Sequence, residues 1–72
     1  MDDRSRKDIR RILKIFGIQA DEAMVAHLAR NPEVDTLKVR VILQDITEYS
    51  GATPEPPLGV VIEDEVRRQN DS

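Results

Sequence analysis

The sequence predicts a small, mostly α-helical domain of four short helices with one or two very short strands. Three observations lead to this prediction. The chain has 72 residues, 39% of them hydrophobic, which is enough for one modest core. Apolar residues near the amino end recur at steps of three and four, which is the spacing of one helix face. Capping residues precede the expected helices, and glycine or proline follows them.

The first helix is expected at residues 5–16, after a flexible amino terminus at residues 1–4. Ser5 can cap this helix, and Gly17 stands where a left-handed residue would end it. Two opposite faces follow from the spacing. The apolar face comprises Ile9, Ile12, Leu13 and Phe16, and the basic face comprises Arg4, Lys7, Arg11 and Lys14. The pattern therefore predicts an amphipathic helix with a basic outer side.

A second helix is expected at 21–30 and a third at 36–50. Asp21 and Asp35 can cap them, and Asn31-Pro32 and Gly51 end them. The third segment has two interpretations, helix or strand. The residues at strand spacing are Leu37, Val39, Val41 and Leu43, and those at helical spacing are Val39, Ile42, Leu43, Ile46 and Tyr49. The helical spacing extends further and the caps bracket it, so a helix is favoured and a strand over 36–43 stays open.

The rest of the expected domain is a proline-rich linker at 52–57, a strand-like run at 59–62 and a final helix at 62–69. Residues 70–72 are expected to be a flexible tail, so that 5–69 form one domain. The spacing of the apolar residues predicts the core, which comprises Ile9, Ile12, Leu13, Phe16, Met24, Leu28, Leu37, Val41, Ile42, Ile46, Val61 and Val66.

Composition bounds the function. The chain has no cysteine and no apolar run long enough to cross a bilayer, so an intracellular location is expected: nuclear in a eukaryote, cytoplasmic in an archaeon or bacterium. His27 is the only histidine and no phosphate-binding glycine loop is present. A chain this short rarely encloses a substrate cavity. We therefore expect no catalytic, metal or cofactor site, and a function in binding.

Charge is unevenly distributed along the chain. Residues 1–14 hold six basic and three acidic residues, a net of +3, and the remainder holds five basic and eleven acidic residues, a net of −6. An acidic body repels nucleic acid, so direct nucleic-acid binding is not expected, and only the basic first helix could support it. No membrane association is expected. The basic face of that helix is a candidate surface for a protein partner.

One family resemblance covers nearly the whole chain. Residues 12–18 (Ile-Leu-Lys-Ile-Phe-Gly-Ile), 21–24 with Leu28, and 59–66 resemble the amino-terminal domain of the B subunit of DNA polymerase epsilon and the related domain of archaeal D-family polymerase small subunits. The resemblance implies a four-helix fold similar to the lid of AAA+ ATPases. It also implies an accessory, non-catalytic domain in DNA replication that binds polymerase subunits or other replisome proteins.

A second resemblance covers about half of the chain. The sequence Phe16-Gly17-Ile18 and the apolar spacing up to Leu43 resemble ubiquitin-associated domains, which have three helices. This resemblance implies ubiquitin as the alternative partner, bound through Ile18 and Leu43. The sequence departs from that family where Ile18 replaces the usual aromatic residue. The candidate partner-binding residues are therefore Arg4, Lys7, Arg11, Lys14, Ile18 and Leu43.

Overall fold

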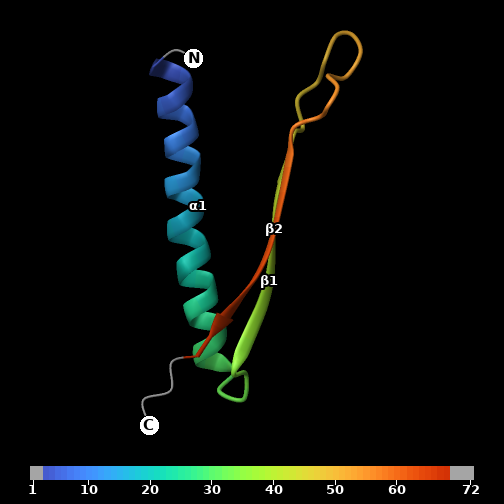
Figure 1. Ribbon diagram of the computed structural model, residues 1–72. Coiled ribbons are helices and arrows are strands. Elements are labelled where there is room, and N and C mark those ends of the chain that lie inside the picture. The colour runs from blue at the N-terminus through green and yellow to red at the C-terminus, as the bar shows by residue number, and fades with distance from the viewer. Residues whose placement is uncertain (1–2, 69–72) are drawn as a thin grey trace. The chain divides into compact units, whose positions relative to one another are not determined.

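The computed structural model describes residues 3–68 and consists of one long helix and one β-hairpin (Figure 1). Helix α1 spans Asp3–Arg30, and strands β1 (Thr36–Gln44) and β2 (Gly59–Arg67) form a two-stranded antiparallel sheet. The chain divides into two compact units, with the division between Val34 and Asp35. The predicted four-helix domain is therefore wrong, because the first two expected helices form one continuous helix and the other two expected helical regions contain strands.

Helix α1 replaces the two separate helices predicted at 5–16 and 21–30. Gly17 does not end the first of them but lies within α1, as do Ile18, Gln19 and Ala20. Two features explain the continuity. The apolar spacing continues in phase beyond Gly17, and a single glycine costs a helix only about 1 kcal/mol relative to alanine. Arg4, predicted to be in a flexible terminus, is already helical.

The carboxyl end of α1 lies where the sequence predicted it, at Asn31-Pro32. The side-chain amide of Asn31 donates a hydrogen bond to the carbonyl of His27 at 2.8 Å. The Asn31 N–H donates to the Leu28 carbonyl at 3.3 Å, and the Val34 N–H donates to the Asn31 carbonyl at 3.0 Å. These bonds satisfy carbonyls at the end of the helix and turn the chain toward β1.

The helix predicted at 36–50 is wrong, and the strand alternative is correct over Thr36–Gln44. Residues 36–44 form a strand, as their alternation of apolar and polar residues allows, because strand β2 lies 23 residues further on and pairs with them. Nine residue pairs align without a break, from Thr36 opposite Arg67 to Gln44 opposite Gly59. This pairing forms hydrogen bonds between the backbone N–H and C=O groups of the two strands. Local helix signals do not reveal that these hydrogen bonds can form.

Strand β2 replaces the helix predicted at 62–69. The strand-like run at 59–62 is confirmed as its first part, and the strand continues through Arg67. Beyond it, the Arg68 N–H donates a hydrogen bond to the Asp35 carbonyl at 2.8 Å, which closes the base of the hairpin. The proline-rich segment 52–57 lies in the connection between the strands and contains no helix or strand. The predicted tail at 70–72 lies outside the described residues.

The predicted core is also wrong. None of the described residues is buried. Ile46, which was expected in the core, is 86% exposed because it lies past the end of β1 in the connection. Half-buried apolar residues do occur on the strands, and they are Leu37, Val39, Val41 and Val66. The molecule therefore has partly covered apolar surfaces in place of an enclosed core.

Replacing Gly17 by alanine should stabilise the protein by roughly 0.5–1 kcal/mol. A Cβ at this position meets no atom within 4 Å, so alanine adds helix propensity without a clash. Thermal unfolding followed by circular dichroism measures the change. Gln19→Ala, two residues away, is the control and should have a much smaller effect. A lower melting temperature for Gly17→Ala would support the predicted helix end at this position.

Reversing the charge of Arg40 should destabilise the hairpin, because Arg40→Glu places a carboxylate opposite Glu63. We expect a loss of roughly 0.5–1 kcal/mol, since cross-strand charge pairs at exposed positions are of this size. The double variant Arg40→Glu with Glu63→Arg should recover most of it, as measured by urea unfolding. Failure of the second change to rescue the first would contradict the observed register.

Candidate interaction surface

The register of the hairpin separates its side chains into two chemically different faces. Residues directly opposite one another in an antiparallel pair lie on the same side of the sheet. One side, here called the apolar face, comprises Leu37, Val39, Val41 and Leu43 of β1 with Val60, Ile62, Asp64 and Val66 of β2. Seven of these eight residues are apolar. Such a face is typical of a surface that packs against another element or another protein.

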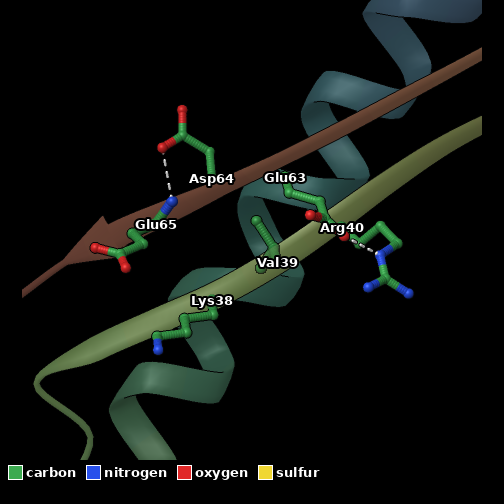
Figure 2. A pocket seen from close by; sticks show the side chains of 6 residues that line it. All are labelled: Lys38, Val39, Arg40, Glu63, Asp64 and Glu65. Carbon is green, nitrogen blue, oxygen red and sulfur yellow. Dashed lines mark hydrogen bonds and ion pairs between the residues drawn. The ribbon is translucent and has the colours of Figure 1, made fainter.

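The other side, the charged face, carries cross-strand pairs of opposite charge. Lys38 lies opposite Glu65, and Arg40 lies opposite Glu63. The Arg40 Nε lies 2.5 Å from the Glu63 Oε2, and both side chains are more than half exposed (Figure 2). Exposed ion pairs contribute little stability, but among the neighbouring registers only this one places both cations opposite anions. The charged pairs therefore help to fix the register that keeps the apolar face continuous.

Asp64 is the one charged residue on the apolar face. It lies opposite Val39, and its Oδ1 accepts a hydrogen bond from the Glu65 N–H at 2.7 Å (Figure 2). A carboxylate loses stabilising hydration when an apolar surface covers it. Any partner that covers this face must therefore leave the Asp64 carboxylate in water or give it a cation.

The chemistry of the hollow around Asp64 does not resemble a catalytic site. It is lined by Lys38, Val39, Arg40, Glu63, Asp64 and Glu65. The charged side chains among them are exposed to solvent, so their carboxylates are not desolvated in the way that general acid catalysis requires. Within residues 3–68, no three His, Cys, Asp or Glu side chains are placed to hold a metal ion.

Helix α1 carries a second apolar surface, here called the apolar stripe. Because the helix is continuous, the stripe runs past Gly17 at steps of three and four. Its members are Ile9, Ile12, Leu13, Phe16, Ala20, Ala23 and Met24. The larger side chains of its amino-terminal half, from Ile9 to Phe16, are all exposed. The stripe is thus open to a partner over at least two turns.

The candidate residues predicted from the sequence fall on two separate units. Four of them, Arg4, Lys7, Arg11 and Lys14, lie along one side of α1, and Ile18 continues that line by one turn. The Arg11 Nη1 forms an exposed ion pair with the Asp8 Oδ1 at 2.8 Å. Leu43 lies on the apolar face of the hairpin. The six candidates therefore do not form one surface within either unit.

The prediction missed most of the apolar face. Val60 and Ile62 were recognised as strand-like, but not as the partners of Leu43 and Val41. A signal was present in the sequence. The segment around Lys38-Val39-Arg40 carries cations at alternate positions, and Glu63-Asp64-Glu65 carries anions at the same spacing. Reversed, these two segments match as an antiparallel pair with opposite charges facing one another.

A small hydrogen-bonded cluster follows β1 at the start of the connection. The Asp45 Oδ1 accepts the Thr47 N–H at 2.9 Å, and the Asp45 Oδ2 accepts the Tyr49 hydroxyl. Hydrogen bonding from the Thr47 side chain, followed by that from Tyr49, holds the pKa of Asp45 below its ordinary value. The same bond to Asp45 raises the pKa of Tyr49. The cluster links the first residues of the connection to one another through the Asp45 carboxylate.

The chain was compared with models of known protein families, with curated proteins and with solved structures, and none of the three comparisons gives a match. In the part of the chain that the structure describes, no helix has the length and apolar character needed to cross a membrane. The functional interpretation accordingly depends on the chemistry of the surfaces described above.

The Asp45 cluster should give the connection a stability that depends on pH. Because the folded-state pKa of Asp45 is lowered, its contribution is present above the unfolded pKa and is lost as the pH falls through the folded value. For Tyr49, whose pKa is raised, the contribution is lost as the pH rises through the folded value. A carbon-13 NMR titration of the Asp45 carboxyl group measures the first effect.

Tyr49→Phe tests whether the Tyr49 hydroxyl lowers the pKa of Asp45. It removes one hydrogen-bond donor and should move the Asp45 pKa part of the way back toward its ordinary value. Thr53→Val, in the same connection, is the control and should leave the Asp45 titration unchanged. An Asp45 titration that is the same in Tyr49→Phe as in the wild-type protein would show that the hydroxyl bond is absent in solution.

Proposed function

We propose that this chain is a non-catalytic protein-interaction module and that the apolar face of its hairpin is the main contact surface. The observation that supports this proposal is the apolar face itself. Seven apolar side chains lie on one side of a two-stranded sheet, and none of the described residues is buried. Exposed apolar patches of this kind mark surfaces that another macromolecule covers.

The exposure of individual residues supports the same interpretation. Leu43, Val60 and Ile62 lie near the connection end of the apolar face, and each is exposed. A two-stranded hairpin is marginally stable in water unless its apolar face packs on something else. Coverage of this surface by a protein partner would therefore supply binding energy and hairpin stability together. The exposed charged face would remain in water.

The fold does not support the partners that the two family resemblances implied. The replication function and the ubiquitin alternative were both implied by resemblances that require three or four helices, and residues 3–68 contain one. Gly17, the centre of the ubiquitin-binding loop in that resemblance, lies within α1. Polymerase subunits, replisome proteins and ubiquitin therefore enter as candidate partners for testing, without structural support from the fold.

Site-specific photocrosslinking in the native cells tests the proposal. A photoreactive amino acid at Leu43 samples the apolar face, and the same amino acid at Gln44 samples the charged face one residue away. We expect protein crosslinks from position 43 at least about tenfold more abundant than those from position 44. Mass spectrometry then identifies the partner, and purified ubiquitin serves as a separate binding probe.

Two outcomes would contradict the proposal. Equal crosslinking from both positions would show that the apolar face has no special role. Crosslinks from position 43 to nucleic acid in place of protein would show that the apolar face contacts nucleic acid and is not a protein-binding surface. Leu43→Asp supplies the matched functional control, because it should abolish binding of the identified partner while Gln44→Asp leaves it unchanged.

A further inference from the structure

Each unit on its own lacks a way to cover its apolar residues. A two-stranded sheet has two faces and two open edges, and isolated hairpins of this kind are marginal in water. A single 28-residue helix likewise has no second element within its own unit. The stability of the hairpin therefore requires an additional element, and the composition of its two edges indicates which one.

The two edges of the sheet differ in composition. Strand β1, with the sequence TLKVRVILQ, contains five apolar residues, the two cations Lys38 and Arg40, no acidic residue and no proline. Strand β2 contains four charged residues, of which Glu63, Asp64 and Glu65 are in succession. Long edges without proline or a bulge are templates for pairing with another strand, and charged residues protect an edge against it. The composition thus marks β1 as the pairing edge and β2 as the protected edge.

We propose that two copies of this chain pair through their β1 edges, forming a four-stranded antiparallel sheet in the order β2-β1-β1-β2. This inference goes beyond the proposed function, because the second copy pairs along the β1 edge and the joined apolar faces stay open to a partner. Sheets of three or more strands with an apolar face have the independent stability that a lone hairpin lacks. The two β2 strands become the outer edges, so the assembly closes as a dimer.

Asp64 supports this strand order over the reverse one. Its carboxylate is the one charge on the apolar face, opposite Val39. Pairing through β2 would place two Asp64 residues at the centre of a covered apolar surface, where an unpaired charge is costly. Pairing through β1 leaves Asp64 on the outer strands, where the carboxylate reaches water at the rim of the sheet.

The register of the new pair follows from charge and from the faces. A two-fold axis through Val41 places Val39 of one copy opposite Leu43 of the other, which keeps the apolar faces of both copies on one side. It also places Arg40 opposite Ile42. An axis through Arg40 would set two guanidinium groups opposite one another, which is unfavourable. The Val41 register therefore joins the apolar faces without opposing like charges.

Pairing through β1 doubles the width of the apolar face. Nine residues per strand at about 3.3 Å per residue give a length of about 30 Å, and four strands about 4.8 Å apart give a width of about 19 Å. Edge pairing also adds backbone hydrogen bonds across the two-fold axis.

Analytical ultracentrifugation of the full chain from about 1 to 300 µM, with a matched pair of variants, tests the proposal. Ile42 on β1 and Val61 on β2 lie opposite each other, and they are 60% and 63% exposed. Ile42→Lys places an ammonium opposite the second copy's guanidinium, twice per dimer, and should raise the dimer Kd at least about tenfold. Val61→Lys, on the outer strand, should change it less than about threefold. Ile42→Glu offers the opposite charge to Arg40 and should preserve the dimer.

Single-cysteine crosslinking adds a direct measure of proximity, because the chain has no cysteine of its own. Val41→Cys lies on the proposed two-fold axis and should form an intermolecular disulfide on mild oxidation. Ile62→Cys, its cross-strand partner, is the control and should not, because the outer strands lie about 14 Å apart in the proposed sheet. Disulfide formation by Ile62→Cys alone would overturn the strand order.

The remaining outcomes separate this inference from the proposed function. A monomer with cooperative unfolding at all concentrations would overturn both, because the chain would then cover its own apolar face. A monomer without cooperative unfolding would overturn the dimer alone and leave the apolar face to a different protein. An equal weakening of the dimer by Ile42→Lys and Val61→Lys would also overturn pairing through β1. So would assemblies that grow beyond a dimer as the concentration rises.

Discussion

The constraint that governs this molecule is that neither a lone helix nor a two-stranded sheet encloses its own apolar side chains. Within residues 3–68, the structure consists of these two elements, and none of these residues is buried. Hydrophobic stabilisation scales with the apolar area removed from water, and many of these side chains are still about half exposed. The apolar face and the apolar stripe are consequently both structural requirements and interaction surfaces.

Pairing of β1 with β2 creates the apolar face and fixes its composition. A shift of one residue would interchange the two sides and place Lys38 and Arg40 among the apolar residues of the opposite strand. The opposition of Arg40 and Glu63, and of Lys38 and Glu65, disfavours such a shift. Modest exposed charges therefore have a large structural consequence, because they select the register that joins seven apolar side chains into one surface.

Parts of the fold were predictable from local sequence, and the errors have identifiable causes. The helical character of residues 5–16 and 21–30 and the helix end at Asn31-Pro32 were predicted correctly, because helix spacing and proline act over a few residues. Gly17 was overinterpreted as a helix end. The segment from Thr36 to Gln44 was assigned to a helix because its caps are local signals, whereas its partner strand lies 23 residues away. Leu43 was singled out as a binding residue, but its neighbours Val60 and Ile62 across the sheet were not.

The sequence by itself determined the amphipathic character of α1 and the basic side that includes Arg4 and Lys7. These properties depend on residue type and on spacing within a few turns. The tertiary structure decided the strand identity of residues 36–44 and 59–67 and the composition of the apolar face. The physical reason is that a β-strand obtains half of its hydrogen bonds and its face partners from a distant segment, whereas a helix forms its bonds within itself.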